Sequence, residues 1–201
     1  MRPLRLLSAT GLLIAGLTVG FDAVKAQQDA AKPQQQTAPS APEEFTAIAA
    51  NISNVGAAGL TPVTIRIDRW TPPDEQDKLL GALRDKGQDE FLKELTRAKA
   101  VGWIATPTSL RYDFFYAQQQ PAENGRRIMM ITDRPMQIAE RMSAAPSREY
   151  PFSVIELHLD KDGRGTGTLA QLVQLRLSGN YLGIENLATG PIKLNEVRKV
   201  K

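Results

Sequence analysis

Hydrophobic and polar residues alternate along much of the chain, and this pattern predicts its strands. Val63, Ile65 and Ile67 alternate with polar neighbours, which is the two-residue period of a strand with one buried face. Similar runs predict further strands at residues 45–52, 101–105, 110–116, 126–132, 181–187 and 192–198. Between them, residues 118–125 and 143–151 predict loops, and residues 136–142 one or two helical turns.

Residues 152–177 form the clearest hairpin, because two apolar runs flank a polar turn at residues 160–165 that contains Asp and Gly. The second limb alternates strictly. Its odd-numbered positions from 169 to 177 are expected on one face, and its even-numbered positions from 168 to 176 on the other. With the two strands that follow, the pattern predicts a four-stranded antiparallel meander from residue 152 onward.

The period changes to that of helices between residues 71 and 99. Thr71 is a possible cap before two prolines, Leu79 and Leu83 share one helical face, and Gly87 ends the first helix. A second helix is expected over residues 88–99. Two short helices packed on a sheet are the favoured interpretation, and a partner-binding helical hairpin is the alternative.

This order of elements predicts an α+β fold that is mainly antiparallel β-sheet, with a two-helix insertion after the second strand. Such a sheet can curl into an open barrel, whose closure the pattern does not specify.

The first residues predict export. Arg2 and Arg5 precede a mostly apolar run over residues 6–21, and small residues follow near Ala26, as in a secretory signal peptide. An uncleaved anchor is the alternative, but the run is short for a membrane span. We therefore expect a signal peptide at 1–26, a disordered Gln-, Ala- and Pro-rich tether at 27–42, and a single β-rich α+β domain at 43–201. The expected location is the periplasm or the extracellular space, with no stable membrane span after cleavage.

Charge and cysteine content narrow the function classes. The 201-residue chain contains no cysteine, which excludes disulfides, thiol nucleophiles and thiolate metal sites. Removal of the predicted signal peptide leaves 22 basic and 21 acidic residues. This near-neutral balance gives little support for a nucleic-acid partner.

The turn of the hairpin resembles the start of a calcium loop at Asp160 and Asp162. A calcium-binding EF-hand needs an oxygen ligand at the fifth loop position and a glutamate at the twelfth, where this chain has Arg164 and Gln171. Both flanks also predict strands rather than helices. We therefore expect a solvated hairpin turn, no metal site and no cofactor.

Two groups of residues are candidates for a binding site. Large rings lie in or beside strands and can line the mouth of a barrel, although core packing is the commoner role: Trp70, Trp103, Tyr112, Phe114 and Tyr116. Charged or titratable residues on or beside strands form the second group, although alternating charge on a strand is usually its wet face: Asp113, Asp133, Arg134, Glu156 and His158. His158 is the only histidine, and no nucleophile elbow accompanies it.

Several short stretches between residues 62 and 198 together resemble a family of small exported bacterial proteins of unknown function. They are Leu79-Leu80, Ala82-Leu83, Gly87-Gln88, Leu110-Arg111-Tyr112-Asp113, Tyr116-Ala117, Thr132-Asp133-Arg134-Pro135, Tyr150-Pro151-Phe152, Glu156-Leu157, Leu159-Asp160-Lys161-Asp162-Gly163 and Glu185-Asn186. The resemblance implies secretion and a shared fold, and it transfers no catalytic residue.

Three hypotheses about function remain open. The favoured one is an exported, non-catalytic binding or interaction domain, whose partner is a protein or a small apolar ligand. The alternative is a carboxylate-dependent hydrolase acting on an envelope or extracellular polymer, which needs two carboxylates at a defined separation in one cleft. A structural protein of the envelope is the third, supported only by the tether.

Overall fold

The computed structural model describes residues 41–51, 59–108, 111–134, 136, 150–178, 181–186 and 190–201. The chain divides into two compact units, Met1–Thr37 and Ala38–Lys201, and the described residues all belong to the second. The predicted signal peptide, almost all of the tether, and most of the helical turns expected at residues 136–142 lie outside the described residues.

The described residues form ten strands and two helices. In chain order these are β1 (Glu43–Asn51), β2 (Gly59–Ile67), α1 (Pro73–Lys86), α2 (Gln88–Leu95), β3 (Gly102–Ala105), β4 (Tyr112–Phe114), β5 (Tyr116–Ala122), β6 (Gly125–Thr132), β7 (Phe152–Asp160), β8 (Arg164–Ser178), β9 (Tyr181–Asn186) and β10 (Ile192–Lys199).

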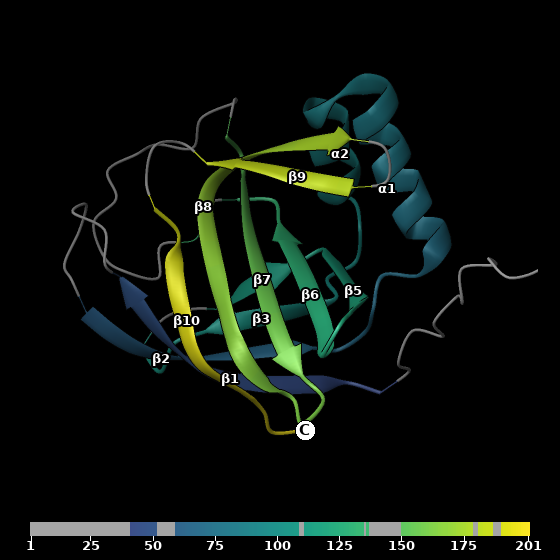
Figure 1. Cartoon of the computed structure of the whole chain (residues 1–201). Coiled ribbons are helices and arrows are strands. Elements are labelled where there is room, and N and C mark those ends of the chain that lie inside the picture. The colour runs from purple at the N-terminus through teal and green to yellow at the C-terminus, as the bar shows by residue number, and fades with distance from the viewer. Residues whose placement is uncertain are drawn as a thin grey trace, which may run out of the picture. The chain divides into compact units, whose positions relative to one another are not determined.

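The strands form one antiparallel sheet in the order β4-β3-β2-β1-β10-β8-β7-β6-β5, with β9 beside β8. Figure 1 shows that this sheet curls into a nearly closed barrel. One seam is left unsealed, between β4 and β5 at the two ends of the strand order. The predicted fold class is therefore confirmed. The last step of the predicted meander is wrong, because β10 pairs with β8 and β1 rather than with β9.

The seam lies where the sequence predicted one strand over residues 110–116. Phe115 separates β4 from β5, and its N–H donates to the carbonyl of Ile131 at 3.0 Å. β4 therefore pairs with β3, and β5 pairs with β6. The predicted loop at 118–125 is also wrong: β5 continues to Ala122, where Pro121 is tolerated because this strand is an edge of the sheet.

Thr71 partly closes the seam. Its N–H donates to the carbonyl of Ala117 at 3.0 Å, and its Oγ1 accepts a hydrogen bond from the N–H of Ala117 at 2.8 Å. The prediction that Thr71 caps α1 is wrong, because the N-cap is Pro72 and has no side-chain cap. The hydroxyl instead satisfies the exposed edge of β5.

A bulge changes the faces of β8. Leu172 has a φ of 51°, and the register with β7 shifts between Phe152 and Val154. Leu169, before the bulge, faces the barrel interior, whereas Val173, after it, packs in the core beneath the helices. The prediction that positions 169 and 173 share one face is therefore wrong. The long strand consequently serves two partners, β10 along its first half and β9 along its second.

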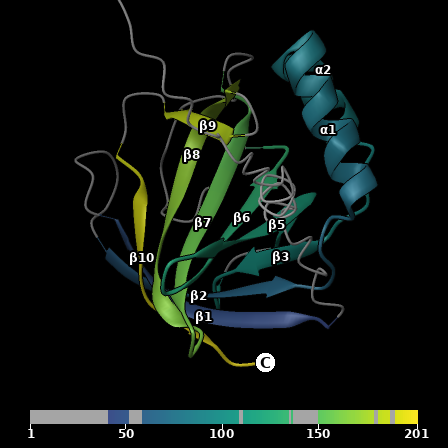
Figure 2. The same cartoon turned by 45° about the vertical axis from the view of Figure 1, so that its right-hand side comes forward.

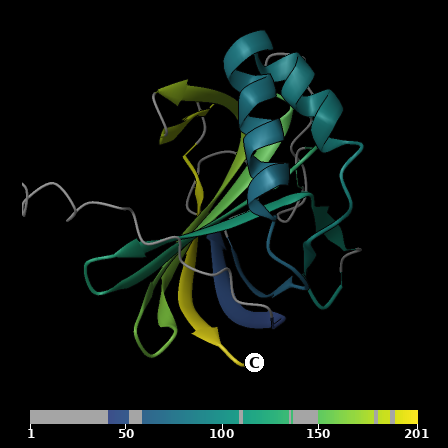
Figure 3. The same cartoon turned by 90° about the vertical axis from the view of Figure 1, so that its right-hand side faces the viewer.

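Two hydrophobic cores result. The first fills the barrel with inward-facing residues such as Phe45, Ile65, Ile104 and Leu157. The second lies outside the barrel wall, where Leu79, Leu83, Phe91 and Leu95 of the helices pack against the outer faces of β5–β8. Figures 2 and 3 show the two helices as a separate layer outside the sheet.

α1 ends at the glycine that its sequence predicts, but α2 is shorter than predicted. Gly87 ends α1 with a φ of 85°, a conformation that favours glycine, and its N–H donates to Leu83. α2 ends at Leu95 rather than Lys99, because the following N–H groups of Arg97 and Ala98 bond three residues back and tighten the last turn.

The turn of the β7–β8 hairpin has the chemistry expected from its sequence. One carboxylate oxygen of Asp160 accepts hydrogen bonds from the N–H groups of Asp162 and Arg164, each at 2.9 Å. The side chain thus stabilises the turn from within.

A polar cluster lies at the end of the barrel where β1 starts and β10 ends. We call its members, Glu43, Gln119, Arg126 and Lys199, the barrel-end cluster. Glu43 accepts two hydrogen bonds from Arg126, at 3.0 and 2.5 Å, and lies 3.5 Å from the Nζ of Lys199. Gln119 accepts another from Arg126 at 2.8 Å. The Glu43 side chain is only 5% exposed, so these contacts replace most of its lost hydration.

Candidate functional site

The structure brings Glu156 and His158, both predicted site residues, into direct contact on β7. His158 Nε2 lies 2.5 Å from Glu156 Oε1, and Arg127 donates to Glu156 Oε2 at 2.8 Å. Arg127 was not among the predicted residues. We call Arg127, Glu156 and His158 the outer-wall cluster.

Strand alternation explains the position of this cluster. On β7, Phe152 and Val154 face the helices, and Glu156 and His158 continue the same outer face beyond them. Arg127 lies directly opposite His158 on β6. The cluster is therefore the polar continuation of the surface on which the helices pack. Each carboxylate oxygen of Glu156 has a basic neighbour, an arrangement suited to holding side chains in place.

The predicted aromatic residues divide among three environments. Trp70 and Phe114 belong to the barrel core, and Tyr112 packs against it. Trp103 lies on the outer face of β3, where the Arg111 guanidinium stacks 4.2 Å from its ring centroid.

Tyr116 is fully buried in the second core, because the break at Phe115 turns its ring toward the helices. Burial raises the pKa of Tyr116, and the charge of Asp77 on α1 adds to that rise. The structure thus distributes these five rings over the barrel interior, its outer wall and the helix interface.

The remaining predicted residues lie in local contacts. Asp133 and Arg134 follow β6 and form an ion pair with each other at 3.6 Å. Asp113 lies opposite Trp103 in the β3–β4 pairing. Among the described residues, Asp133 and Glu156 each form an ion pair with a basic side chain. No group of three or more His, Asp or Glu side chains in this part of the chain is placed to hold a metal ion.

A groove of about 300 Å³ lies between α1 and α2, the two helices for which a partner-binding hairpin was the alternative interpretation of the sequence. Its walls carry Asp77 and Asp85 from α1 and Glu90 and Glu94 from α2. We call this feature the interhelical groove.

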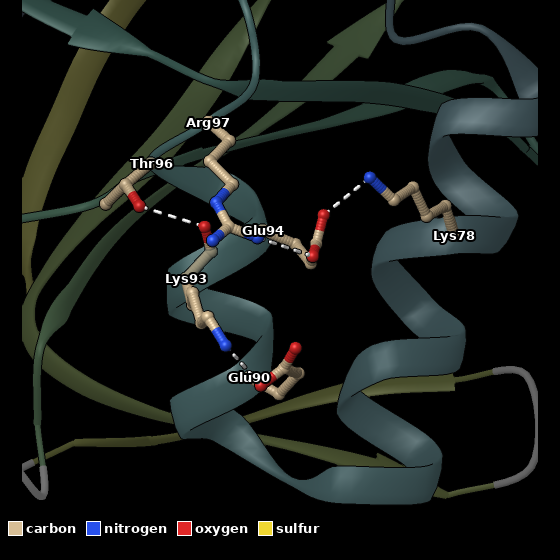
Figure 4. Close-up of polar contacts among 6 residues, drawn as sticks. All are labelled: Lys78, Glu90, Lys93, Glu94, Thr96 and Arg97. Carbon is tan, nitrogen blue, oxygen red and sulfur yellow. Dashed lines mark hydrogen bonds and ion pairs between the residues drawn. The ribbon is translucent and has the colours of Figure 1, made fainter.

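Ion pairs order one side of this groove (Figure 4). Lys78 reaches across from α1 to Glu94 at 2.5 Å, and Arg97 contacts the same carboxylate at 3.3 Å. The hydrogen bond from Lys78 lowers the pKa of Glu94 below its usual value, against the opposing effect of burial. Lys93 contacts Glu90 at 3.4 Å. Basic residues therefore already engage both carboxylates that α2 contributes to the groove.

The two aspartates on α1 differ from these glutamates. Asp77 and Asp85 are exposed, and neither forms an ion pair with a described residue. They are eight residues apart, so two turns of helix place them along one stripe with Gly81 midway. The sequence signal for this groove was therefore present as a mid-helix glycine between two aspartates at i−4 and i+4.

None of the described helices is long and apolar enough to cross a membrane. Comparisons of the chain with models of protein families, with curated proteins and with solved structures find no match.

Proposed function

We propose that this protein is an exported, non-catalytic binding domain that uses a filled barrel as a scaffold and binds its partner through the exposed face of its helix layer. The observation that carries this proposal is the interhelical groove, which leaves charged side chains of α1 accessible on a rigidly supported surface. The inner faces of both helices are fixed by Leu79, Leu83, Phe91 and Leu95 in the second core.

The packing of the barrel supports an external binding surface. Inward-facing aliphatic and aromatic side chains fill the interior, and the barrel-end cluster occupies one end. The described interior thus has the composition of an ordinary protein core. Of the two partner types expected from the sequence, a protein suits this arrangement better than a small apolar ligand within the barrel.

The placement of the termini supports the same conclusion. Glu44 at the start of β1 exchanges backbone hydrogen bonds with Val200 and Lys201, so the domain begins and ends at one place. The helix layer lies at the opposite end of the sheet from the C-terminus in Figures 1 and 3. A domain held through a segment before Glu43 would present its helices away from that attachment.

Site-specific photo-cross-linking in the cells that export the protein tests the binding function. Benzoylphenylalanine is placed at Ala82 in the groove and, as a matched control, at exposed Lys193 on β10. We expect a discrete cross-linked product from position 82 and none from position 193. Absence of any discrete product from either position would overturn the proposal, whereas a product from position 193 alone would retain binding but move its surface.

Export is tested separately. Cell fractionation should find the protein outside the cytoplasm, and mass spectrometry of the purified protein should give an N-terminus at Gln27. Protein retained in the cytoplasm with Met1 still present would contradict export.

A further inference from the structure

We propose that the second half of β8 and β9 form a latch, which opens as one unit about the bulge at Leu172 while the barrel stays folded. We call residues 174–178 and 181–186 the β8–β9 ribbon. When the ribbon opens, Leu175 leaves the second core, which also holds the apolar faces of both helices. The latch therefore controls how firmly the helix layer is held. This inference concerns a movement of the fold and is independent of whether the domain binds through its helices.

The ribbon has no backbone hydrogen bonds to the rest of the described sheet. β7 pairs with β8 only as far as Val173, β10 pairs with it only as far as Leu169, and β9 pairs with β8 alone. Both outer edges of the ribbon are therefore unpaired among the described residues. A two-stranded hairpin is at best marginally stable in water on its own, so the ribbon depends on the core beneath it.

The core supports the ribbon less firmly than it supports the barrel strands. Leu175 is buried in the second core. Leu177, Leu182 and Ile184 are only partly buried against it. Figure 1 shows the ribbon leaving the direction of the barrel strands and crossing toward the helices. Unpaired edges and partly exposed apolar contacts are the features of a segment that opens locally.

The bulge supplies the pivot of this movement. Leu172 has a φ of 51°, a left-handed conformation that is costly for leucine, and this strain lies where β8 changes its partner strand. Just before the bulge, the side-chain amide of Gln171 donates to the carbonyl of Met136 and anchors the strand. Beyond the bulge, Arg176 donates to Glu185 at 2.8 Å across the ribbon. This contact and the ladder hold the two strands together as one unit.

Hydrogen exchange of the full chain tests the latch. We expect the amides of the ribbon to exchange ~100-fold faster than the slowest amides of β1 and β7, because they need only local opening. Ile65→Val, a small change inside the barrel, should speed exchange in β1 and β7 about fivefold and leave the ribbon unchanged. The contacts of this side chain are intact when only the latch is open, so the change makes only global unfolding easier. Equal acceleration of the ribbon would overturn the inference, because the ribbon would then open only with the whole domain.

A single introduced thiol gives an independent measurement, because the chain contains no cysteine. Leu175→Cys places the thiol in the ribbon, and the matched control Leu169→Cys makes the same change before the bulge in the same strand. Both leucines are at most 3% exposed. We expect the thiol at position 175 to react with a soluble thiol reagent ~100-fold faster than the thiol at position 169. Equal rates at the two positions in folded protein would overturn the inference.

Discussion

Replacing one member of the buried Glu43–Arg126 pair should destabilise the domain more than replacing both. Arg126→Met removes two charge-assisted hydrogen bonds from a carboxylate that is 5% exposed, and leaves it with Lys199 at 3.5 Å. Breaking a buried pair typically costs 3–5 kcal/mol. Because Lys199 remains and Arg126 is itself 23% exposed, we expect about 3 kcal/mol. Glu43→Leu should cost about 2 kcal/mol, since Arg126 retains Gln119 and some water.

The double variant Glu43→Leu/Arg126→Met is the decisive member of this cycle. It leaves neither charge unpaired, and apolar replacements of a buried pair are often close to neutral. We expect a loss of less than about 1.5 kcal/mol, well below the sum of the single changes. Urea unfolding followed by tryptophan fluorescence measures these free energies, and the Arg126→Met loss corresponds to roughly 6–12 °C in Tm.

An exposed ion pair provides the matched control. Arg176 and Glu185 lie 2.8 Å apart on the β8–β9 hairpin, with side chains 69% and 49% exposed. Arg176→Met should cost less than about 1 kcal/mol, because solvent screens such pairs. If the barrel-end substitutions prove additive, or cost no more than this exposed one, the proposed burial effect is refuted.

Three further predictions concern single side chains. Burial raises the pKa of Tyr116, so the folded state holds this phenol proton more tightly than the unfolded chain does. The stability that this phenol contributes is present below about pH 10 and is lost as the pH rises further. Tyr116→Phe should therefore reduce the fall in unfolding free energy between about pH 9 and 11. An equal fall in both proteins would refute this. Thr71→Val should cost about 1–3 kcal/mol in urea unfolding, because it leaves the buried N–H of Ala117 without its acceptor, whereas Thr71→Ser should retain most of the stability. Glu196 has a φ of 50°, which costs a glutamate more than an asparagine, so Glu196→Asn should raise Tm slightly, and a lowered Tm would contradict the strain.

Local patterns were sufficient to predict the fold class and most of the strands, but not the positions where a strand changes its partner or face. The rings at 112, 114 and 116 have perfect alternation, yet the hydrogen bond from Phe115 to β6 turns Tyr116 away from the other two. The bulge at Leu172 does the same in β8. Both depend on pairing with distant segments, which a two-residue period does not encode.

The candidate sites were predictable only where their members share a strand. Glu156 and His158 are two residues apart on one face of β7, so their contact follows from alternation. Arg127 joins them from β6 through the sheet register, and the interhelical groove requires both helices to be placed. Glu43 and Arg126 are 83 residues apart, which explains why no local pattern revealed their contact.

A run of four apolar residues in β6 shows in the sequence which part of the sheet the helices cover. Residues 128–131 of β6 are continuously apolar and buried, with Ile128 and Met130 in the barrel and Met129 and Ile131 beneath the helices. Such a run is the mark of a strand covered on both faces, and it identifies the part of the wall that a helix layer must cover. Covering that wall commits the apolar faces of α1 and α2 to the second core. Their opposite faces are free of this structural requirement, and that freedom leaves the interhelical groove open on the surface through which we propose that the domain binds.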